Sequence, residues 1–296
     1  MIKKRWIIQK LLNVTSDLLR EKDIENPRLC AEVLLGYQLK KTRVDLYLEF
    51  DRPLNEFELN GFRSLIKRRL KREPLQYITG HREFWSLDFL VNPSVLIPRP
   101  ETEILIEEAL KLRKENLLPQ SSKPKILDLC TGCGVIAISL AKEITLADVW
   151  ASDISSKAIN TAKTNAKLHN VESQIKFFQG DLWKPFQSFS ENFDIIISNP
   201  PYVLTEMIQN LSPEIYLYEP KIALDGHENG MYFIEKIIKE SCEYLKPGGW
   251  LLMEMGPDQT EKALSLLESL KFYDYIEKIM DYGKKFRAVK AQRTNG

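Results

Sequence analysis

Short apolar runs alternate with helical patterns along residues 125–255, and this alternation constrains the fold more than any other feature. Strand-type runs rich in Ile, Leu, Val and Phe fall at residues 125–129, 148–152, 175–178, 193–198 and 250–255. Helical patterns separate them near 135–141, 155–169 and 230–245. Strands that alternate with helices favour a parallel sheet with crossover helices. We therefore expect an open α/β sheet that binds ligands at the carboxyl ends of its strands.

The first 80 residues carry a different pattern, in which apolar residues recur at helical spacing. Helices are expected near residues 7–19, from Asn26-Pro27 onward, and from Asn55 to about residue 72. Residues 1–80 hold 17 Lys and Arg against 11 Asp and Glu, a net +6, whereas the remaining 216 hold 25 against 30, a net −5. The basic run at 67–72 suits nucleic acid or an acidic protein surface, or else it is a solvated helix face.

Between these two regions the sequence predicts a β-hairpin. Residues 83–91 and 95–97 are rich in strand-forming residues, and Asn92-Pro93-Ser94 between them is a turn sequence. We expect a helical domain at residues 1–80, a hairpin linker at 81–100 and the α/β domain at 101–296. The opposite net charges of front and rear indicate different partners for the two domains.

Composition disfavours several classes of protein. With 44% hydrophobic and 28% charged residues, the chain has the balance of a globular protein. No run approaches the roughly 18 to 20 apolar residues of a membrane helix, and the first residues lack an export-signal core, so the cytoplasm is the expected location. Cys130 and Cys133 have the CxxC spacing of a zinc or redox pair, but without a second ligand pair we expect no metal there.

A stiff turn follows the strand predicted at 193–198. In Asn199-Pro200-Pro201-Tyr202, the two prolines restrict the backbone and remove two N–H donors. The Asn199 side-chain oxygen and the Pro200 carbonyl can together accept both hydrogens of an NH2 group, while the Tyr202 ring covers the planar group that carries it. Such a pocket suits a neutral amide or amino nitrogen. The alternative is a proline-rich turn with no chemical role.

Acidic residues end the neighbouring strands. Residues 128–134, Asp-Leu-Cys-Thr-Gly-Cys-Gly, join the first strand to its helix with small residues that let a ligand approach the backbone. Their spacing is not GxGxxG, which disfavours a pyrophosphate. Asp153 ends the second strand, where a ribose-binding carboxylate is expected, and Asp181 with Leu182 follows the third, placed for a base amino group and its ring. Each acid alone is a turn or cap residue, but together they favour a nucleoside site.

This constellation resembles the class I methyltransferases that bind S-adenosylmethionine, and among them the release-factor glutamine methyltransferases. The resemblance rests on the Asn199-Pro200-Pro201-Tyr202 turn and on flanking motifs, namely Pro74, Gln76, Tyr77 and Gly80, then residues 96–103, and then Glu219-Pro220 with Ala223-Leu224. It covers nearly the whole chain. Two departures are Cys130, where many relatives carry glycine, and residues 225–230, where the family loop is richer in glycine.

The resemblance implies a Rossmann-like fold, with a seven-stranded, mostly parallel sheet between two layers of helices. It implies methyl transfer from S-adenosylmethionine, leaving S-adenosylhomocysteine, to the side-chain amide nitrogen (N5) of the glutamine in the Gly-Gly-Gln loop of class I peptide-chain release factors, which supports translation termination. Residues 1–80 would dock the release factor. No membrane and no direct nucleic-acid substrate are expected.

The site residues that the resemblance implies form two sets. Asn199, Pro200 and Tyr202 are expected to be catalytic, and Pro201 joins them in the substrate-binding turn. The cofactor-binding set is Asp128, Leu129, Cys130, Thr131, Gly132, Gly134, Asp153, Asp181, Leu182 and Asn199. No residue has a strong claim as general base, so we expect catalysis by alignment, which can be worth about 7–11 kcal/mol. Accepting the amide hydrogens also favours the positive charge that builds on nitrogen.

Other functions share parts of this pattern. A nucleic-acid adenine N6-methyltransferase has a similar turn, and its basic front region would track phosphates, but residues 1–80 contain no recognisable base-reading module. The turn does not distinguish a ribosomal-protein glutamine methyltransferase from a release-factor glutamine methyltransferase. A nucleoside- or RNA-binding adaptor with an idle pocket is disfavoured by the intact Asp128, Asp153, Asp181 and Asn199.

Overall fold

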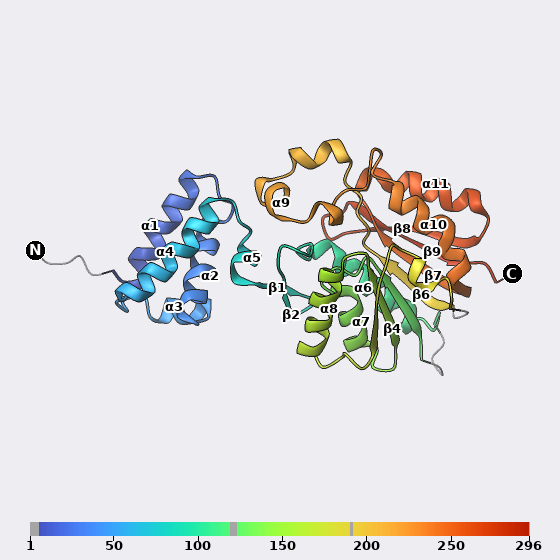
Figure 1. The fold of residues 1–296 in the computed structure, drawn as a ribbon, viewed down its shortest axis with the longest axis horizontal. Coiled ribbons are helices and arrows are strands. Elements are labelled where there is room, and N and C mark those ends of the chain that lie inside the picture. The colour runs from blue at the N-terminus through green and yellow to red at the C-terminus, as the bar shows by residue number, and fades with distance from the viewer. Residues whose placement is uncertain (1–5, 119–122, 190–191, 296) are drawn as a thin grey trace, which may run out of the picture. The chain divides into compact units, whose positions relative to one another are not determined.

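The chain forms two compact units in the computed structural model, which describes residues 6–118, 123–189 and 192–295 (Figure 1). Unit 1 comprises Met1–Gly80 together with Ser212–Tyr218, and unit 2 comprises His81–Leu211 and Glu219–Gly296. Each unit has its own hydrophobic core. Segment 212–218 therefore belongs to unit 1 by its contacts, although it lies far from the rest of unit 1 in the sequence.

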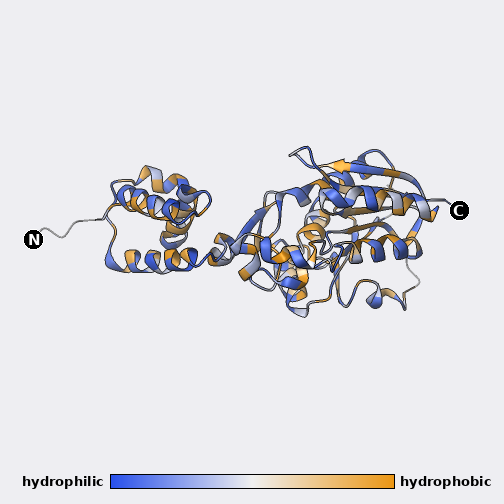
Figure 2. Cartoon of the chain, turned by 90° about the horizontal axis from the view of Figure 1, so that it is seen from above, coloured by the Kyte–Doolittle hydropathy of each residue, from blue (hydrophilic) through white to orange (hydrophobic). Residues whose placement is uncertain are grey.

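Unit 1 is helical. Its helices are α1 (Ile8–Glu21), α2 (Pro27–Leu39), α3 (Arg43–Leu48), α4 (Glu56–Leu70), α5 (Leu75–Thr79) and α9 (Pro213–Tyr218). Helix α2 packs against both α1 and α4, and the core between them buries Leu12, Leu34 and Phe62. Figure 2 shows the resulting alternation of hydrophobic and hydrophilic residues along the helices. The three long helices predicted from the sequence are confirmed, whereas α3, α5 and α9 were not predicted.

Two helix starts in unit 1 show what the cap residues do. Asn55 accepts from the Glu58 N–H and Glu58 accepts from the Asn55 N–H, both at 2.9 Å, which is a capping box at the start of α4. Helix α2 begins at Pro27 as predicted, but Asn26 is not its side-chain cap. Asn26 is left-handed, with φ 49° and ψ 51°, and makes no side-chain cap bond. The fixed φ of the proline, rather than the asparagine, marks this helix start.

The basic run at the end of α4 is largely used inside unit 1. Arg68 makes a two-point ion pair with Glu73, with nitrogen–oxygen distances of 2.5 and 2.8 Å. Arg72 donates to the backbone carbonyls of Lys22 and Asp23 at 2.8 and 2.9 Å. These guanidinium groups hold the turns after α1 and α4 in place. Arg68 and Arg72 are therefore bound within unit 1 while 42% and 30% of their side chains stay exposed, and a partner-binding role for this run stays a prediction.

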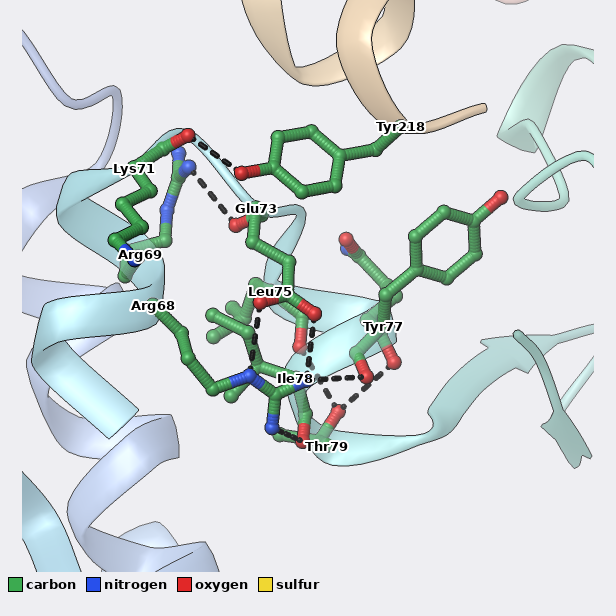
Figure 3. A network of polar contacts seen from close by, with 10 residues as sticks. Arg68, Arg69, Lys71, Glu73, Leu75, Tyr77, Ile78, Thr79 and Tyr218 are labelled. Carbon is green, nitrogen blue, oxygen red and sulfur yellow. Dashed lines mark hydrogen bonds and ion pairs between the residues drawn. The ribbon is translucent and has the colours of Figure 1, made fainter. Parts of the chain in front are cut away.

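The short helix α9 is attached to α4 by polar contacts. Arg69 is only 5% exposed, and its guanidinium lies 2.9 Å from a carboxylate oxygen of Glu214. The Tyr218 hydroxyl donates to the Lys71 carbonyl at 2.7 Å (Figure 3). Helix α9 itself buries no residue fully. The ion pair and the tyrosine bond therefore carry much of its attachment to unit 1.

Unit 2 is built on a seven-stranded sheet with the order β5-β4-β3-β6-β7-β9-β8. The parallel strands are β5 (Ile175–Gln179), β4 (Asp148–Asp153), β3 (Lys125–Leu129), β6 (Phe193–Ser198) and β7 (Leu245–Glu254). Strand β9 (Phe286–Arg293) pairs antiparallel with both β7 and β8 (Tyr273–Met280). Every residue of β6 is buried, as expected for a strand covered on both faces. The predicted seven-stranded, mostly parallel sheet is confirmed.

Helices cover both faces of this sheet. Helices α6 (Glu103–Lys114), α7 (Val135–Glu143) and α8 (Ser156–Leu168) form one layer, and α10 (Tyr232–Tyr244) and α11 (Thr260–Leu270) form the other (Figure 1). The single-turn helices are η1 (Pro100–Thr102), η2 (Lys184–Phe186), η3 (Thr205–Asn210), η4 (Lys221–Ala223) and η5 (Pro257–Gln259). Among the described residues, no helix is both long and apolar enough to cross a membrane. The carboxyl ends of β5, β4, β3 and β6 lie side by side along one edge.

The hairpin of unit 2 lies earlier in the chain than the sequence indicated. Its strands are β1 (His81–Phe84) and β2 (Leu87–Leu90), so the turn is Trp85-Ser86 and not Asn92-Pro93-Ser94. Both turn residues have positive φ, 52° and 55°, and the Trp85 N–H donates to Glu103 at 2.9 Å. Asn92 instead forms a local turn by accepting from the Ser94 N–H at 2.9 Å. The predicted hairpin is therefore confirmed, whereas its predicted strand bounds, 83–91 and 95–97, and its predicted turn are wrong.

Candidate active site

A cavity lies at the carboxyl edge of the sheet in unit 2. It holds about 1010 Å³ of space, part of it open to solvent. Many of its lining residues come from the segments that follow β5, β4, β3 and β6, which are neighbours in the sheet in that order, and others come from residues 94–102, 222–223 and Phe233. The lining includes eight residues predicted from the sequence: Cys130, Thr131, Gly132, Asp153, Asp181, Leu182, Asn199 and Pro201. The order of the parallel strands therefore brings most of the predicted residues to one site.

Five other predicted residues do not line this cavity, namely Asp128, Leu129, Gly134, Pro200 and Tyr202. Asp128 and Leu129 are fully buried inside β3, and Gly134 immediately precedes α7. Pro200 is buried within the turn, and Tyr202 is partly buried behind it. Asp128, Leu129 and Gly134 therefore support the cavity wall, and Pro200 and Tyr202 continue the turn beside Asn199.

Asp128 holds the loop after β3 by hydrogen bonds. Its Oδ2 accepts from the Thr131 hydroxyl at 2.6 Å and from the Ala137 N–H at 3.1 Å, so it joins the loop to the start of α7. Its Oδ1 has no hydrogen-bond partner among the described residues. Burial raises the pKa of the Asp128 carboxyl to about 7, against the lowering effect of these two bonds.

The loop itself bends tightly because three of its residues have positive φ. These are Cys130 at 61°, Gly132 at 58° and Gly134 at 89°. A side-chain carbon on Gly132 would meet no atom within 4 Å, so the backbone borders open space there. Cys130 takes the conformation that glycine adopts freely, at a strain of roughly 1–2 kcal/mol for an L-residue. The departure from glycine at this position therefore leaves the bend intact.

The two cysteines of this loop are free thiols. Burial raises the pKa of Cys130 strongly and that of Cys133 to about 12, so both thiols are protonated at neutral pH. A thiol must lose its proton to bind zinc. Within the described ranges, no group of three or more His, Cys, Asp or Glu is arranged to hold a metal ion.

Asp153 and Asp181 lie along the cavity at the ends of β4 and β5. The Asp153 carboxylate accepts from the N–H groups of Gly132 and Ser155, each at 2.9 Å, and burial raises its pKa. Each of its oxygens keeps a lone pair for a further donor. Asp181 lies 3.1 Å from the Lys184 ammonium. The two carboxylates therefore offer acceptors at two points of the cavity wall.

Apolar residues that sequence reasoning missed complete this part of the cavity. Ile154, Ile222 and Phe233 line it, and Ile154 is 49% exposed although it is a large apolar residue. Its place directly after Asp153, the acid that ends the predicted strand, is a signal that the sequence does contain. Phe233 lies in the first turn of α10, where no sequence pattern marks it. Together with Leu182 these side chains provide a surface for a flat apolar ring.

At the other end of the cavity, Asn199 belongs to a hydrogen-bond network. Its Nδ2 donates to the Thr102 hydroxyl oxygen at 3.1 Å, and that hydroxyl donates to Glu254 Oε2 at 2.6 Å. The Tyr202 hydroxyl donates to the other carboxylate oxygen, Oε1, at 3.2 Å. Glu254 ends β7 next to β6, which is why it lies beside Asn199. Sequence reasoning did not identify Glu254 as a site residue, and it found Thr102 only within a motif.

The backbone of the turn is held as firmly as its side chains. Gln259 Nε2 donates to the Tyr202 carbonyl at 2.8 Å and to the Gly230 carbonyl at 3.0 Å. The Ser198 hydroxyl donates to the Leu129 carbonyl at 2.8 Å, which joins the ends of β6 and β3. The turn after β6 is therefore a rigid part of the wall, and Asn199 Oδ1 has no hydrogen-bond partner among the described residues.

An ion pair joins two of the sequence motifs beside the cavity. Arg99, which lines the cavity, lies 2.6 Å from Glu219 Oε1, and Glu219 Oε2 accepts from the Ile97 N–H at 3.2 Å. Glu219 is nearly fully buried. The pair holds residues 97–99 and 219–220 side by side although they are far apart in the sequence.

Comparisons with known proteins show which family the chain belongs to. The PrmC N-terminal domain matches residues 10–80, and the methyltransferase small domain matches residues 107–215. The release factor glutamine methyltransferase of Geobacter sulfurreducens is 44% identical over 91% of this chain and 91% of its own length. That of Chlorobaculum tepidum is 38% identical over 95% of each chain.

A solved structure supports the fold alone. The hMettl16 catalytic domain, in complex with MAT2A 3'UTR hairpin 1, superimposes with a TM-score of 0.57 at 14% identity. The match covers 77% of this chain and 80% of that chain. The sheet and its helices thus share the fold of that catalytic domain.

Proposed function

Because the chain belongs to the family of release factor glutamine methyltransferases, we propose that it methylates the glutamine of the Gly-Gly-Gln loop in class I peptide-chain release factors. The methyl donor is S-adenosylmethionine and the acceptor is the side-chain amide nitrogen. The observation that carries the proposal is the Asn199 carboxamide at the cavity wall, with Nδ2 bound to Thr102 and Oδ1 without a partner among the described residues. A free carbonyl oxygen beside a cavity is what an incoming NH2 group requires.

The residues around the cavity fit S-adenosylmethionine. The Asp153 carboxylate keeps lone pairs for two ribose hydroxyls, as expected for an acid that ends the second strand of a nucleotide-binding sheet. Ile154 and Leu182 border the space for the adenine ring, and Asp181 is an acceptor for its amino group. Gly132 leaves room for the rest of the cofactor beside the loop backbone. When bound, the cofactor supplies a sulfonium-activated methyl group and is released as S-adenosylhomocysteine.

The residues of the turn align the substrate nitrogen. Asn199 Oδ1 and the Pro200 carbonyl accept the two amide hydrogens and hold the nitrogen toward the cofactor, while Tyr202 packs on the amide plane. With the cofactor bound, this alignment would let the N–C bond form as the bond between sulfur and the methyl carbon breaks, and the nitrogen would then lose one proton to water. Both acceptors interact more strongly as positive charge develops on nitrogen, so they stabilise the transition state more than the bound substrate.

Residues 1–80 provide the proposed docking domain for the release factor, and the reaction takes place in the cytoplasm, where translation terminates. Arg68, Arg69 and Arg72 already have partners inside unit 1. The docking contacts are therefore sought among other residues of this unit. No nucleic acid is a direct substrate in this proposal.

A labelling experiment tests the proposed substrate. The protein is incubated with methyl-labelled S-adenosylmethionine and, in separate reactions, with a class I release factor, ribosomal proteins and DNA. We expect label on the release factor, at the Gly-Gly-Gln glutamine, and none on a release factor in which that glutamine is replaced by alanine. Label on ribosomal protein or DNA, with the release factor unlabelled, would overturn the proposal.

A further inference from the structure

Two buried residues lie next to the Asn199 amide on its protein side: Thr102, which also lines the cavity, and Glu254, which does not. We propose that Glu254, acting through the Thr102 hydroxyl, fixes the Asn199 carboxamide with its oxygen toward the substrate and its NH2 group toward the protein. Thr102 and Glu254 are thus positioning residues. The inference rests on the proposed function, because it assigns them a role in presenting the acceptor for the substrate amide.

The hydrogen-bond donors and acceptors around Thr102 determine which way the Asn199 amide faces. An ionised carboxylate only accepts, so the single hydrogen of the Thr102 hydroxyl is committed to Glu254 Oε2, at 2.6 Å. Thr102 Oγ1 can then offer only lone pairs to Asn199. The observed Nδ2 contact at 3.1 Å uses one of them. A rotated carboxamide would place Oδ1 against Thr102 Oγ1, acceptor against acceptor, and would present NH2 donors to the donors of the substrate.

Because Thr102 and Glu254 are buried, their hydrogen bonds fix the orientation of the Asn199 amide strongly. Thr102 is 2% exposed and Glu254 is 1% exposed, so water does not supply an alternative partner for either side chain. The second oxygen of Glu254 accepts from Tyr202, so one carboxylate holds both Asn199 and the tyrosine of the turn. Strand pairing brings this carboxylate into place, because Met253 of β7 lies opposite Ser198 of β6, one residue before each of the two groups.

The charge of Glu254 should therefore control activity. Burial raises its pKa to about 7, whereas bonds from Thr102 and Tyr202 and the charge of Arg287 on β9 lower it. The charge of Glu101, in η1, raises it further. When Glu254 is protonated, its own O–H can donate to Thr102, and the threonine hydrogen becomes free to turn toward Asn199. Both amide orientations are then satisfied, and a fraction of the enzyme presents the wrong group.

Steady-state kinetics at saturating cofactor and release factor test the assignment. Thr102→Val removes the hydroxyl that holds Nδ2 and should lower kcat by at least about tenfold, with the cofactor Kd changed by less than about threefold. Thr102→Ser keeps the hydroxyl and should restore most of the activity. The matched control is Thr260→Val, because Thr260 is also buried, at 1% exposure, and among the described residues its hydroxyl bonds only the Pro257 carbonyl, at 2.9 Å. That control should keep wild-type kcat.

The pH profile separates a positioning role from a packing role. In the wild type, kcat should fall as pH drops below about 7, the pKa of Glu254. Glu254→Gln cannot titrate and should lose this acid limb while retaining measurable activity. Asp128 has a similar pKa, but it acts on the cofactor loop, so its titration appears in the cofactor Kd and persists in Glu254→Gln. Normal kcat in Thr102→Val, with an unchanged acid limb in Glu254→Gln, would refute the inference.

A spectroscopic readout tests the inference even if the release factor is not the substrate. The side-chain NH2 resonances of Asn199 are assigned in ¹⁵N-labelled protein by comparison with Asn199→Ala. We expect them to shift with an apparent pKa near 7 in the wild type and not to titrate in Glu254→Gln or Thr102→Val. Methylation absent but titration present would remove the proposed function and keep the orientation device. Resonances that do not respond to pH in the wild type would remove the device itself.

Discussion

The tight packing of the cofactor loop makes a sharp prediction for Gly134→Ala. At this residue φ is 89°, and an added side-chain carbon would lie 2.9 Å from Ile138 Cδ1 and 3.1 and 3.3 Å from the Cβ and Cα of Ala162. The Ile138 methyl can rotate away. Ala162 cannot, because its single side-chain carbon is fixed to the backbone of α8. The substitution therefore forces α7 and α8 apart as well as straining the backbone.

The magnitude follows from these two terms. A left-handed L-residue costs roughly 1–2 kcal/mol, and overpacking between rigid elements adds about 1–3 kcal/mol. Gly134→Ala should thus lose about 2–5 kcal/mol of unfolding free energy. Gly132→Ala is the matched control, because Gly132 also has positive φ, 58°, but no atom lies within 4 Å of its added carbon. It should lose only the backbone term, about 1–2 kcal/mol.

Urea unfolding followed by tryptophan fluorescence measures both losses, and Trp150, buried in β4, reports on this unit. Cofactor titration should show the reverse order. Relative to the unfolding free energy that each variant loses, Gly132→Ala should lose more cofactor affinity than Gly134→Ala, because its added methyl group enters the cavity that Gly132 lines. Equal unfolding free energies for the two variants would refute the packing argument. A Gly134→Ala protein as stable as the wild type would also refute the assigned backbone strain.

Two further predictions concern charged groups. Asp153→Asn should weaken S-adenosylmethionine binding by about 10- to 100-fold in calorimetry, since a charged acceptor is lost; an unchanged Kd would remove the ribose assignment. Glu214→Gln should speed proteolysis within residues 205–218 by about tenfold, because the partner of buried Arg69 loses its charge. Burial opposes ionisation of Glu214, but its own backbone N–H and Arg69 lower its pKa. The wild type should therefore resist proteolysis at neutral pH and lose this resistance as pH falls through that lowered pKa. A proteolysis rate that does not depend on pH would contradict this.

The sheet and its helices could be predicted because their signals are local. Apolar runs and helical spacing identify β3 to β7 within a few residues, and the acids that follow the strands indicate which edge binds ligand. Once the strands are parallel, Asp153, Asp181 and Asn199 must lie along one edge. Their meeting in one cavity is a consequence of strand order.

Other features depend on distant residues and left no local signal. The hairpin turn at Trp85-Ser86 lacks the Gly or Asn that marks positive φ, and it is held by Glu103, 18 residues away. Glu254 occurs in an apolar strand, where an isolated acid gives no hint of its partner Thr102, 152 positions earlier. Helix α9 forms a unit with α4 through Arg69 and Glu214, which are 145 positions apart. Such pairs are created by the fold.

The most direct test of the account is single-turnover methyl transfer from preformed enzyme and labelled S-adenosylmethionine to a class I release factor, with wild type and Asn199→Ala compared at saturating cofactor. We expect transfer to the Gly-Gly-Gln glutamine by the wild type, and at least a roughly thousandfold slower step in Asn199→Ala because alignment is lost, while the cofactor Kd changes only a few-fold. Near-normal transfer by Asn199→Ala would contradict the claim that this amide oxygen aligns the substrate nitrogen.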